Sequence, residues 1–183
     1  YFRIQLMLSG LFLGANATAL LVYAKQIVGA GAQVTGFIRR VEFPQMLQRL
    51  AARPEAGTGE LIALQKLSLG FGALLTLAIF LASLVMISMF GGFTREAWLL
   101  LSIFCLTILS ESIGQSLVQI LFARGLFAPT ALIRILAVVT GVGFGYLFIG
   151  QIGIAVFAFS DFCSHAVVIG LSLVYLARRA RAT

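Results

Sequence analysis

The chain has 183 residues, of which 61% are hydrophobic and only 10% are charged, and its mean hydropathy is +1.07. Soluble domains are about 45–50% apolar and about 25% charged, so this composition excludes a soluble protein. The net charge of +7 does not indicate nucleic-acid binding, because the basic residues stand mostly at the ends of apolar segments, where they meet anionic headgroups. The chain is therefore predicted to be an all-α integral membrane protein with no nucleic-acid partner.

Six apolar segments follow one another along the chain. They cover residues 1–13, 18–43, 61–90, 96–123, 129–149 and 151–177. A helix needs about 20 apolar residues to cross a bilayer, and short loops force neighbouring helices to run antiparallel. Residues 1–183 are therefore predicted to form a single bundle of about six transmembrane helices. Because the first segment is short and the chain opens at Tyr1 rather than at Met, we expect a fragment of a longer protein.

The longest polar stretch, QRLAARPEAGTGE, covers residues 48–60. Residues 37–53 mix arginines with apolar residues, a pattern typical of a helix that lies in a membrane interface. Residues 44–60 are therefore predicted to form a cytoplasmic amphipathic segment and loop.

The basic residues are distributed unevenly between the two sides of the predicted bundle. If consecutive loops alternate sides, one side has Arg95. The other side has Arg39, Arg40, Arg49, Arg53, Arg124, Arg178, Arg179 and Arg181. Cytoplasmic loops carry the excess of Lys and Arg, so we expect a multi-pass protein with a cytoplasmic C-terminus.

Six ionisable side chains fall inside the apolar segments, where charge is costly. They are Lys25, Lys66, Glu111, Arg134, Asp161 and His165. Lys66 stands near the end of its segment and is expected to extend to the interface. For Lys25 and Arg134 two interpretations are open. Each could extend to an interface, or it could line a cavity and bind an anionic headgroup, with Gln26 beside Lys25.

Glu111 stands about halfway along its segment. With Gln115 and Gln119 it forms a polar stripe at i, i+4 and i+8 on one face of the predicted helix. Such a stripe should face the bundle interior or a watery cavity. A protonated Glu111 that hydrogen-bonds a neighbouring helix is the alternative.

Asp161 and His165 stand one helical turn apart near the middle of the last segment. A buried carboxylate beside a histidine can exchange protons near neutral pH, so this pair is a candidate proton or cation site. An interhelical hydrogen bond is the alternative. The sequence signals neither a nucleophile nor an oxyanion hole, and it has a single histidine, so neither an enzyme nor a metal site or other cofactor is predicted.

Three stretches resemble the C-terminal half of a polysaccharide or lipid-linked oligosaccharide flippase of the multidrug/oligosaccharidyl-lipid/polysaccharide exporter superfamily. The first is FLGANATALLVYAKQIVGAGAQVTGFIRRVEFPQM, the second FGGFTREAWLLLSIFCLTILSESIGQSLVQILFARGLFAPTALIRI, and the third YLFIGQIGIAVFAFSDFCSHAVV. The resemblance covers most of the chain and implies one six-helix lobe of a two-lobe transporter. It further implies alternating access around a cationic cavity in the bacterial inner membrane.

From this resemblance we expect the chain to export a lipid-linked saccharide precursor. Lys25 and Arg134 would bind the anionic headgroup, and Glu111, Gln115 and Gln119 would line the cavity and bind sugar hydroxyls. Gln26 is a further candidate residue of the cavity. Asp161 and His165 would couple the movement of a proton or sodium ion to transport. The expected partners are the lipid-linked saccharide, membrane lipids and the other lobe. The alternatives are a drug/cation antiporter of the same superfamily, a non-transporting membrane scaffold, and a membrane-embedded transferase acting through Asp161 and His165.

Overall fold

A computed structural model describes residues 2–180, and all regular secondary structure within that range is helical. The elements are α1 (Phe2–Phe12), α2 (Gly14–Ala52), α3 (Thr58–Ala63), α4 (Lys66–Met89), α5 (Gly92–Phe104), α6 (Leu106–Ala123), α7 (Phe127–Ile152), the 3-10 helix η1 (Gly153–Ala155) and α8 (Val156–Ala180). The predicted all-α class is confirmed. Tyr1 and Arg181, which the sequence argument also used, lie outside the described residues.

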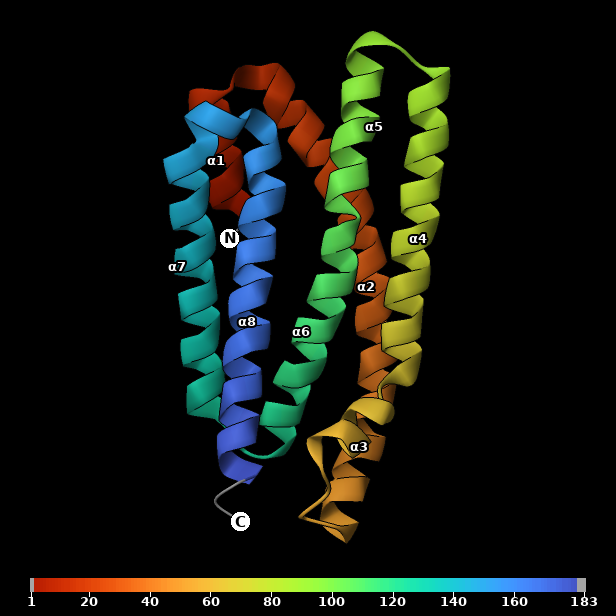
Figure 1. The fold of residues 1–183 in the computed structure, drawn as a ribbon, viewed down its shortest axis with the longest axis vertical. Helices are drawn as coiled ribbons and strands as arrows, with labels where there is room; N and C mark the ends of the chain where they lie inside the picture. The colour runs from red at the N-terminus through yellow and green to blue at the C-terminus, as the bar shows by residue number, and fades with distance from the viewer. Residues whose placement is uncertain (1, 181–183) are drawn as a thin grey trace.

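Three helical stretches of the described chain are long and apolar enough to cross a membrane. They are Lys66–Met89, Thr94–Ala123 and Phe127–Arg179. The third folds back on itself at Gly153, whose φ of 65° favours glycine, so that α7 and α8 run antiparallel side by side (Figure 1). The chain is therefore a multi-pass membrane protein.

Helix α6 occupies the middle of the bundle, between α8 on one side and α2 and α4 on the other (Figure 1). The turns that follow α1, α4 and α7 lie at one end, and α3, the α6–α7 turn and the C-terminal end of α8 lie at the opposite end. The loops therefore alternate between ends, as the charge argument assumed. Arg95 is consequently at the end opposite to Arg124 and Arg179.

Helix α4 turns small and polar side chains inward and large apolar side chains outward. The buried residues of α4 are Ser68, Gly72, Thr76 and Ser83, whereas its Leu67, Phe71, Leu74, Leu77 and Leu81 are exposed. A helix in water would show the reverse pattern. Helices in lipid associate through close packing of small residues and through hydrogen bonds, and the packing of α4 follows that rule.

The first part of the segment predicted at residues 44–60 continues helix α2. Residues 44–52 form its last turns, residues 53–57 form a loop, and α3 follows. Pro44 removes one backbone donor and costs about 3 kcal/mol inside a helix. The helix nevertheless continues because side chains on both sides of Pro44, Glu42 and Met46, are buried against the bundle.

Two predicted helices are interrupted. Residues 61–90 were expected to form one helix, but the chain turns at Leu64 and Gln65, and α4 begins at Lys66, which is exposed. The buried carboxylate of Glu42 accepts hydrogen bonds from the backbone N–H groups of Leu67 (2.9 Å) and Ser68 (3.3 Å). A carboxylate from α2 thus caps the N-terminus of α4, which stabilises a new helix start at this point. The predicted helix 96–123 is divided at Cys105 into α5 and α6, which remain one stretch without a loop between them.

Small residues allow close helix crossings. Ser160 Oγ donates a 2.6 Å hydrogen bond to the carbonyl oxygen of Gly141, and Gly145, four residues further along α7, also faces Ser160, so these two glycines contact α8. At the crossing of α4 and α6, a Cβ atom added to Gly72 would lie 2.6 Å from Ser112 Oγ and 3.0 Å from Ser112 Cβ. These two helices can approach this closely only because Gly72 has no side chain.

Gly72→Ala is expected to lower the free energy of unfolding by about 1–3 kcal/mol, because the new methyl group overpacks the α4–α6 crossing. Thermal unfolding of the purified protein in detergent measures the effect. Gly70→Ala is the matched control, since it lies on the same helix and its added Cβ would meet nothing within 4 Å. Equal melting temperatures for the two variants would contradict the close crossing.

Candidate functional site

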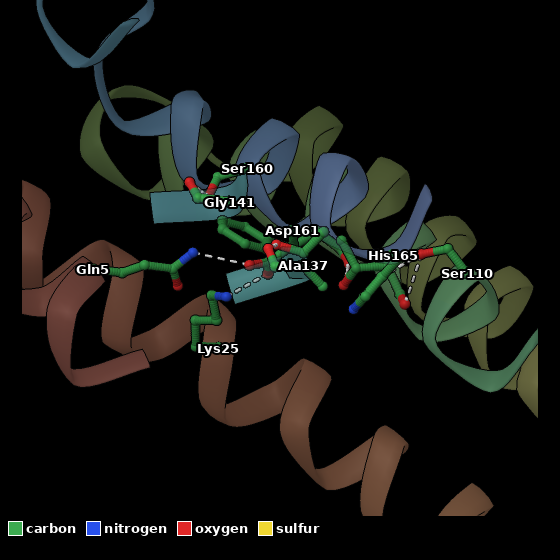
Figure 2. Close-up of polar contacts among 11 residues, drawn as sticks. Gln5, Lys25, Ser110, Ala137, Gly141, Ser160, Asp161 and His165 are labelled. Atoms are coloured by element: carbon green, nitrogen blue, oxygen red, sulfur yellow. Dashed lines mark hydrogen bonds and ion pairs between the residues drawn. The ribbon is translucent and has the colours of Figure 1, made fainter. Parts of the chain in front are cut away.

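An ion pair joins α2 to α8 inside the bundle. Lys25 Nζ of α2 pairs with Asp161 Oδ2 of α8. Gln5 of α1 donates a 2.9 Å hydrogen bond from Nε2 to the other carboxylate oxygen, Oδ1. Figure 2 shows Gln5 and Lys25, from α1 and α2, both directed at the carboxylate of Asp161 on α8. The Lys25 side chain is 14% exposed and that of Asp161 is 9% exposed, so both charges are largely removed from the surface.

The Lys25 ammonium also lies between two aromatic rings. Its Nζ is 5.1 Å from the centroid of the Phe104 ring and 5.9 Å from that of the Phe2 ring, distances suited to cation–π attraction. Lys25 therefore does not extend to an interface. Its charge is balanced inside the bundle, a possibility that the two open interpretations did not include. Gln26, the next residue, is exposed.

Two serines of α8 fix the direction in which Asp161 points. Ser160 Oγ donates to the carbonyl oxygen of Gly141, and Ser164 Oγ donates to that of Ala137 at 2.9 Å. Both acceptors belong to α7, so the two bonds hold one face of α8 against α7 (Figure 2). Because successive residues are about 100° apart around a helix, Asp161 then points to one side of the face that contacts α7, where it meets α1 and α2.

His165 has a different partner from Asp161. Its Nδ1 lies 2.7 Å from Ser110 Oγ of α6. Although the two residues stand one turn apart on α8, Asp161 pairs with α1 and α2, whereas His165 pairs with α6. Asp161 and His165, which were predicted to act as a pair, therefore take part in two separate polar contacts. The two side chains still interact electrostatically.

Glu111 lines a groove between α2 and α6. The groove has a volume of about 550 Å³, and its other lining residues are Gly29, Ala32, Gln33, Gly36, Phe37 and Arg40. Glu111 is half-buried and interacts electrostatically with Arg39 and, less strongly, with Asp161 and Lys25. The groove carboxylate and the buried ion pair therefore belong to one electrostatic network.

The three residues of the predicted polar stripe on α6, Glu111, Gln115 and Gln119, have different surroundings. Gln115 Oε1 accepts a 2.9 Å hydrogen bond from Arg134 Nη2 of α7, and the Arg134 guanidinium lies 6.0 Å from the centroid of the Phe122 ring. Gln119 is half-buried, and its Oε1 has no hydrogen-bond partner among the described residues. The structure brings Arg134 together with Gln115, and Lys25 together with Asp161, but Arg134 does not join the ion pair.

Sequence reasoning missed several buried polar residues that organise the site. Arg39 is 5% exposed and donates from Nη1 to the carbonyl oxygen of Ser112 (3.3 Å). Gln65 Nε2 donates to the carbonyl oxygen of Ser116 (3.3 Å). Arg39 and Glu42 had been placed in a cytoplasmic segment because helix α2 was expected to end near them. One sequence signal could have found Glu42. No Ser, Thr, Asp or Asn stands directly before α4 to cap it, so the first N–H groups of α4 need an acceptor from elsewhere, which Glu42 supplies.

Within residues 2–180, no group of three or more His, Cys, Asp or Glu side chains lies close enough together to hold a metal ion. Comparison with protein-family models, with curated proteins and with solved structures found no match to this chain. The function must therefore be argued from the geometry of the ion pair and the groove.

Removing one partner of the ion pair is expected to destabilise the protein by about 3–5 kcal/mol, because the remaining buried charge is uncompensated. Lys25→Met and Asp161→Asn test this in detergent unfolding experiments, and the double variant should lose less stability than the sum of the two. Lys66→Met, at the exposed start of α4, is the control lysine. Strict additivity of the two single changes would contradict the pairing.

Proposed function

We propose that this chain is one lobe of an alternating-access transporter that moves a lipid-linked saccharide precursor across the bacterial inner membrane. The observation that carries the proposal is the buried Lys25–Asp161 ion pair, which lies in the same electrostatic network as the polar groove between α2 and α6. Charged groups inside membrane helices are costly and are most often retained for transport or ion coupling. The sequence resemblance to polysaccharide flippases supports the same conclusion.

The ion pair suggests how substrate binding and ion movement are linked. A lipid-linked diphosphate is an anion, and Lys25 can bind it only if its pairing with Asp161 weakens. A proton added to Asp161, or a sodium ion bound there, neutralises the carboxylate and releases the ammonium for the diphosphate. Asp161 is then the coupling residue and Lys25 the headgroup-binding residue. His165, hydrogen-bonded to Ser110, would connect the same step to α6.

The remaining polar groups suit the saccharide part of such a substrate. The groove offers Gln33 and Glu111 as hydrogen-bonding groups and the Phe37 ring, which is 63% exposed, as a face for a sugar ring. Gln26, Gln115, Gln119 and Arg134 extend the set as further candidate contacts. In this assignment the Arg-rich end is cytoplasmic, the second lobe of the transporter faces the groove, and the chain has no enzymatic activity.

A cation or drug antiporter is the second candidate. The observation that favours it is the pair of carboxylates, Asp161 and Glu111, which could bind an organic cation once Lys25 is displaced. A scaffold without transport activity would need the ion pair for stability alone. Transport measurements on a variant in which both Lys25 and Asp161 are replaced by uncharged residues distinguish these functions.

The double variant Lys25→Gln/Asp161→Asn keeps hydrogen-bonding side chains but removes both charges. Export of surface polysaccharide is expected to fall about tenfold at equal protein level in the membrane, because a charge-assisted contact with the headgroup is lost. Lys66→Gln is the control and should leave export unchanged. Unchanged export in the double variant would contradict the headgroup role and favour the scaffold.

Asp161→Asn alone tests ion coupling. Transport in proteoliposomes is expected to lose its dependence on the proton or sodium gradient, since an amide neither takes up a proton as a carboxylate can nor attracts a cation as a carboxylate does. Glu96→Gln, at the exposed start of the α5–α6 stretch, is the matched carboxylate control. A gradient dependence equal to that of the unmodified protein would remove Asp161 from the coupling step.

A further inference from the structure

The Glu111 carboxylate lines the groove between α2 and α6 without a direct partner. The side chain is half-buried, and within residues 2–180 no hydrogen bond or ion pair joins it to another residue. Its interactions with Arg39, Asp161 and Lys25 act through space. A carboxylate in this position gives up water without gaining a hydrogen-bond donor, which is costly at membrane depth.

Arg39 is the cation that interacts most strongly with Glu111, and its charge is shared between two carboxylates. The guanidinium interacts electrostatically with both Glu111 and Glu42, whereas its hydrogen bond goes from Nη1 to the carbonyl oxygen of Ser112. Glu42 accepts two backbone N–H groups from α4, and such donors stabilise the ionised form of a carboxyl group. Glu111 has no such donor, so it is the carboxylate of this set that is suited to carry a proton.

The other ionisable groups on the helices around Glu111 have partners or positions of their own. They are Lys25 and Arg40 on α2, Asp161 and His165 on α8, Arg134 on α7, and Lys66 at the exposed start of α4. Lys25 and Asp161 pair with each other, and His165 and Arg134 each have a hydrogen-bond partner on α6. Arg40 is exposed and lies over the ring of Phe37. Arg39 is therefore the cation that decides the charge state of Glu111.

We propose that Glu111 is a proton-binding site, where the carboxylate takes up a proton from solvent in the groove and releases it when Arg39 approaches. Uptake forms an O–H bond on one carboxylate oxygen and leaves the Arg39 charge to Glu42, so that the three groups together become neutral. The protonated group is also a hydrogen-bond donor, which allows the groove both to donate to a ligand and to accept from it. The site concerns the ionisation of one side chain and holds whichever ligand occupies the groove.

Dicyclohexylcarbodiimide tests the site in the intact protein in detergent, because this apolar reagent labels protonated carboxyl groups inside membrane proteins. The carboxyl proton moves to a nitrogen of the reagent, the oxygen adds to its central carbon, and rearrangement gives a stable N-acylurea without a leaving group. At neutral pH, peptide mass spectrometry is expected to find Glu111 labelled roughly tenfold more than the exposed Glu96 or the paired Asp161. Labelling should decrease as the pH rises, and Glu111→Gln should abolish it.

Variants of Arg39 test its part in proton release. Arg39→Gln removes the counter-charge of the ionised form, so labelling of Glu111 should persist to a higher pH than in the wild-type protein. Arg39→Lys keeps the charge and should keep a pH profile close to that of the wild type. Arg40→Gln, which changes the adjacent arginine of the same groove, is the control and should leave the profile unchanged.

Infrared difference spectra provide a measurement that needs no change at Arg39. Wild-type protein and Glu111→Gln are compared across the pH range, and the wild type should show a carboxylic acid C=O band that the variant lacks. The absence of that band, or equal labelling of Glu111 and Glu96 at every pH, overturns the site. Sodium ions that suppress labelling at constant pH would assign a metal cation to the carboxylate and also overturn it. Labelled Glu111 in a protein without transport activity supports the site and counts against the proposed function alone.

Discussion

The Lys25–Asp161 ion pair is the constraint on which the arrangement of the helices depends. In a low-dielectric interior neither charge is tolerable alone, so α2 and α8 must approach wherever these residues stand. Gln5 adds α1 to the same carboxylate, and the serine bonds from α8 to α7 fix the rotation that presents it. Four helices are thereby held in register by polar contacts at one level of the bundle.

Lipid as the solvent explains why so few polar groups organise so much of the structure. Apolar side chains gain little by leaving lipid, so close packing and hydrogen bonds must supply the specificity. Small and polar residues accordingly form the close helix crossings, as at Gly72 against Ser112 and at Gly141 against Ser160. The long apolar side chains of α4 point outward because their neighbours there are acyl chains.

Helix positions could be predicted from the sequence because apolar length alone nearly determines them in a membrane protein. The exceptions were decided by contacts between distant residues. Helix α2 passes Pro44 because buried neighbours hold it, and α4 begins at Lys66 because Glu42 from another helix caps it. The pairing of Lys25 with Asp161 could not be predicted from the sequence for the same reason. Each residue could be recognised as a costly buried charge, but 136 positions separate them and no local pattern joins them.

The length of α2 has a mechanical consequence. Lys25 stands near one end of this 39-residue helix, and the helix continues for about 40 Å beyond it to Ala52. A tilt of about 5° around the ion pair would move the far end by about 3–4 Å, with the start of α4 drawn along through Glu42. A small tilt of α2 at the ion pair near its N-terminal end would thus produce a larger displacement at the arginine-rich end of the bundle.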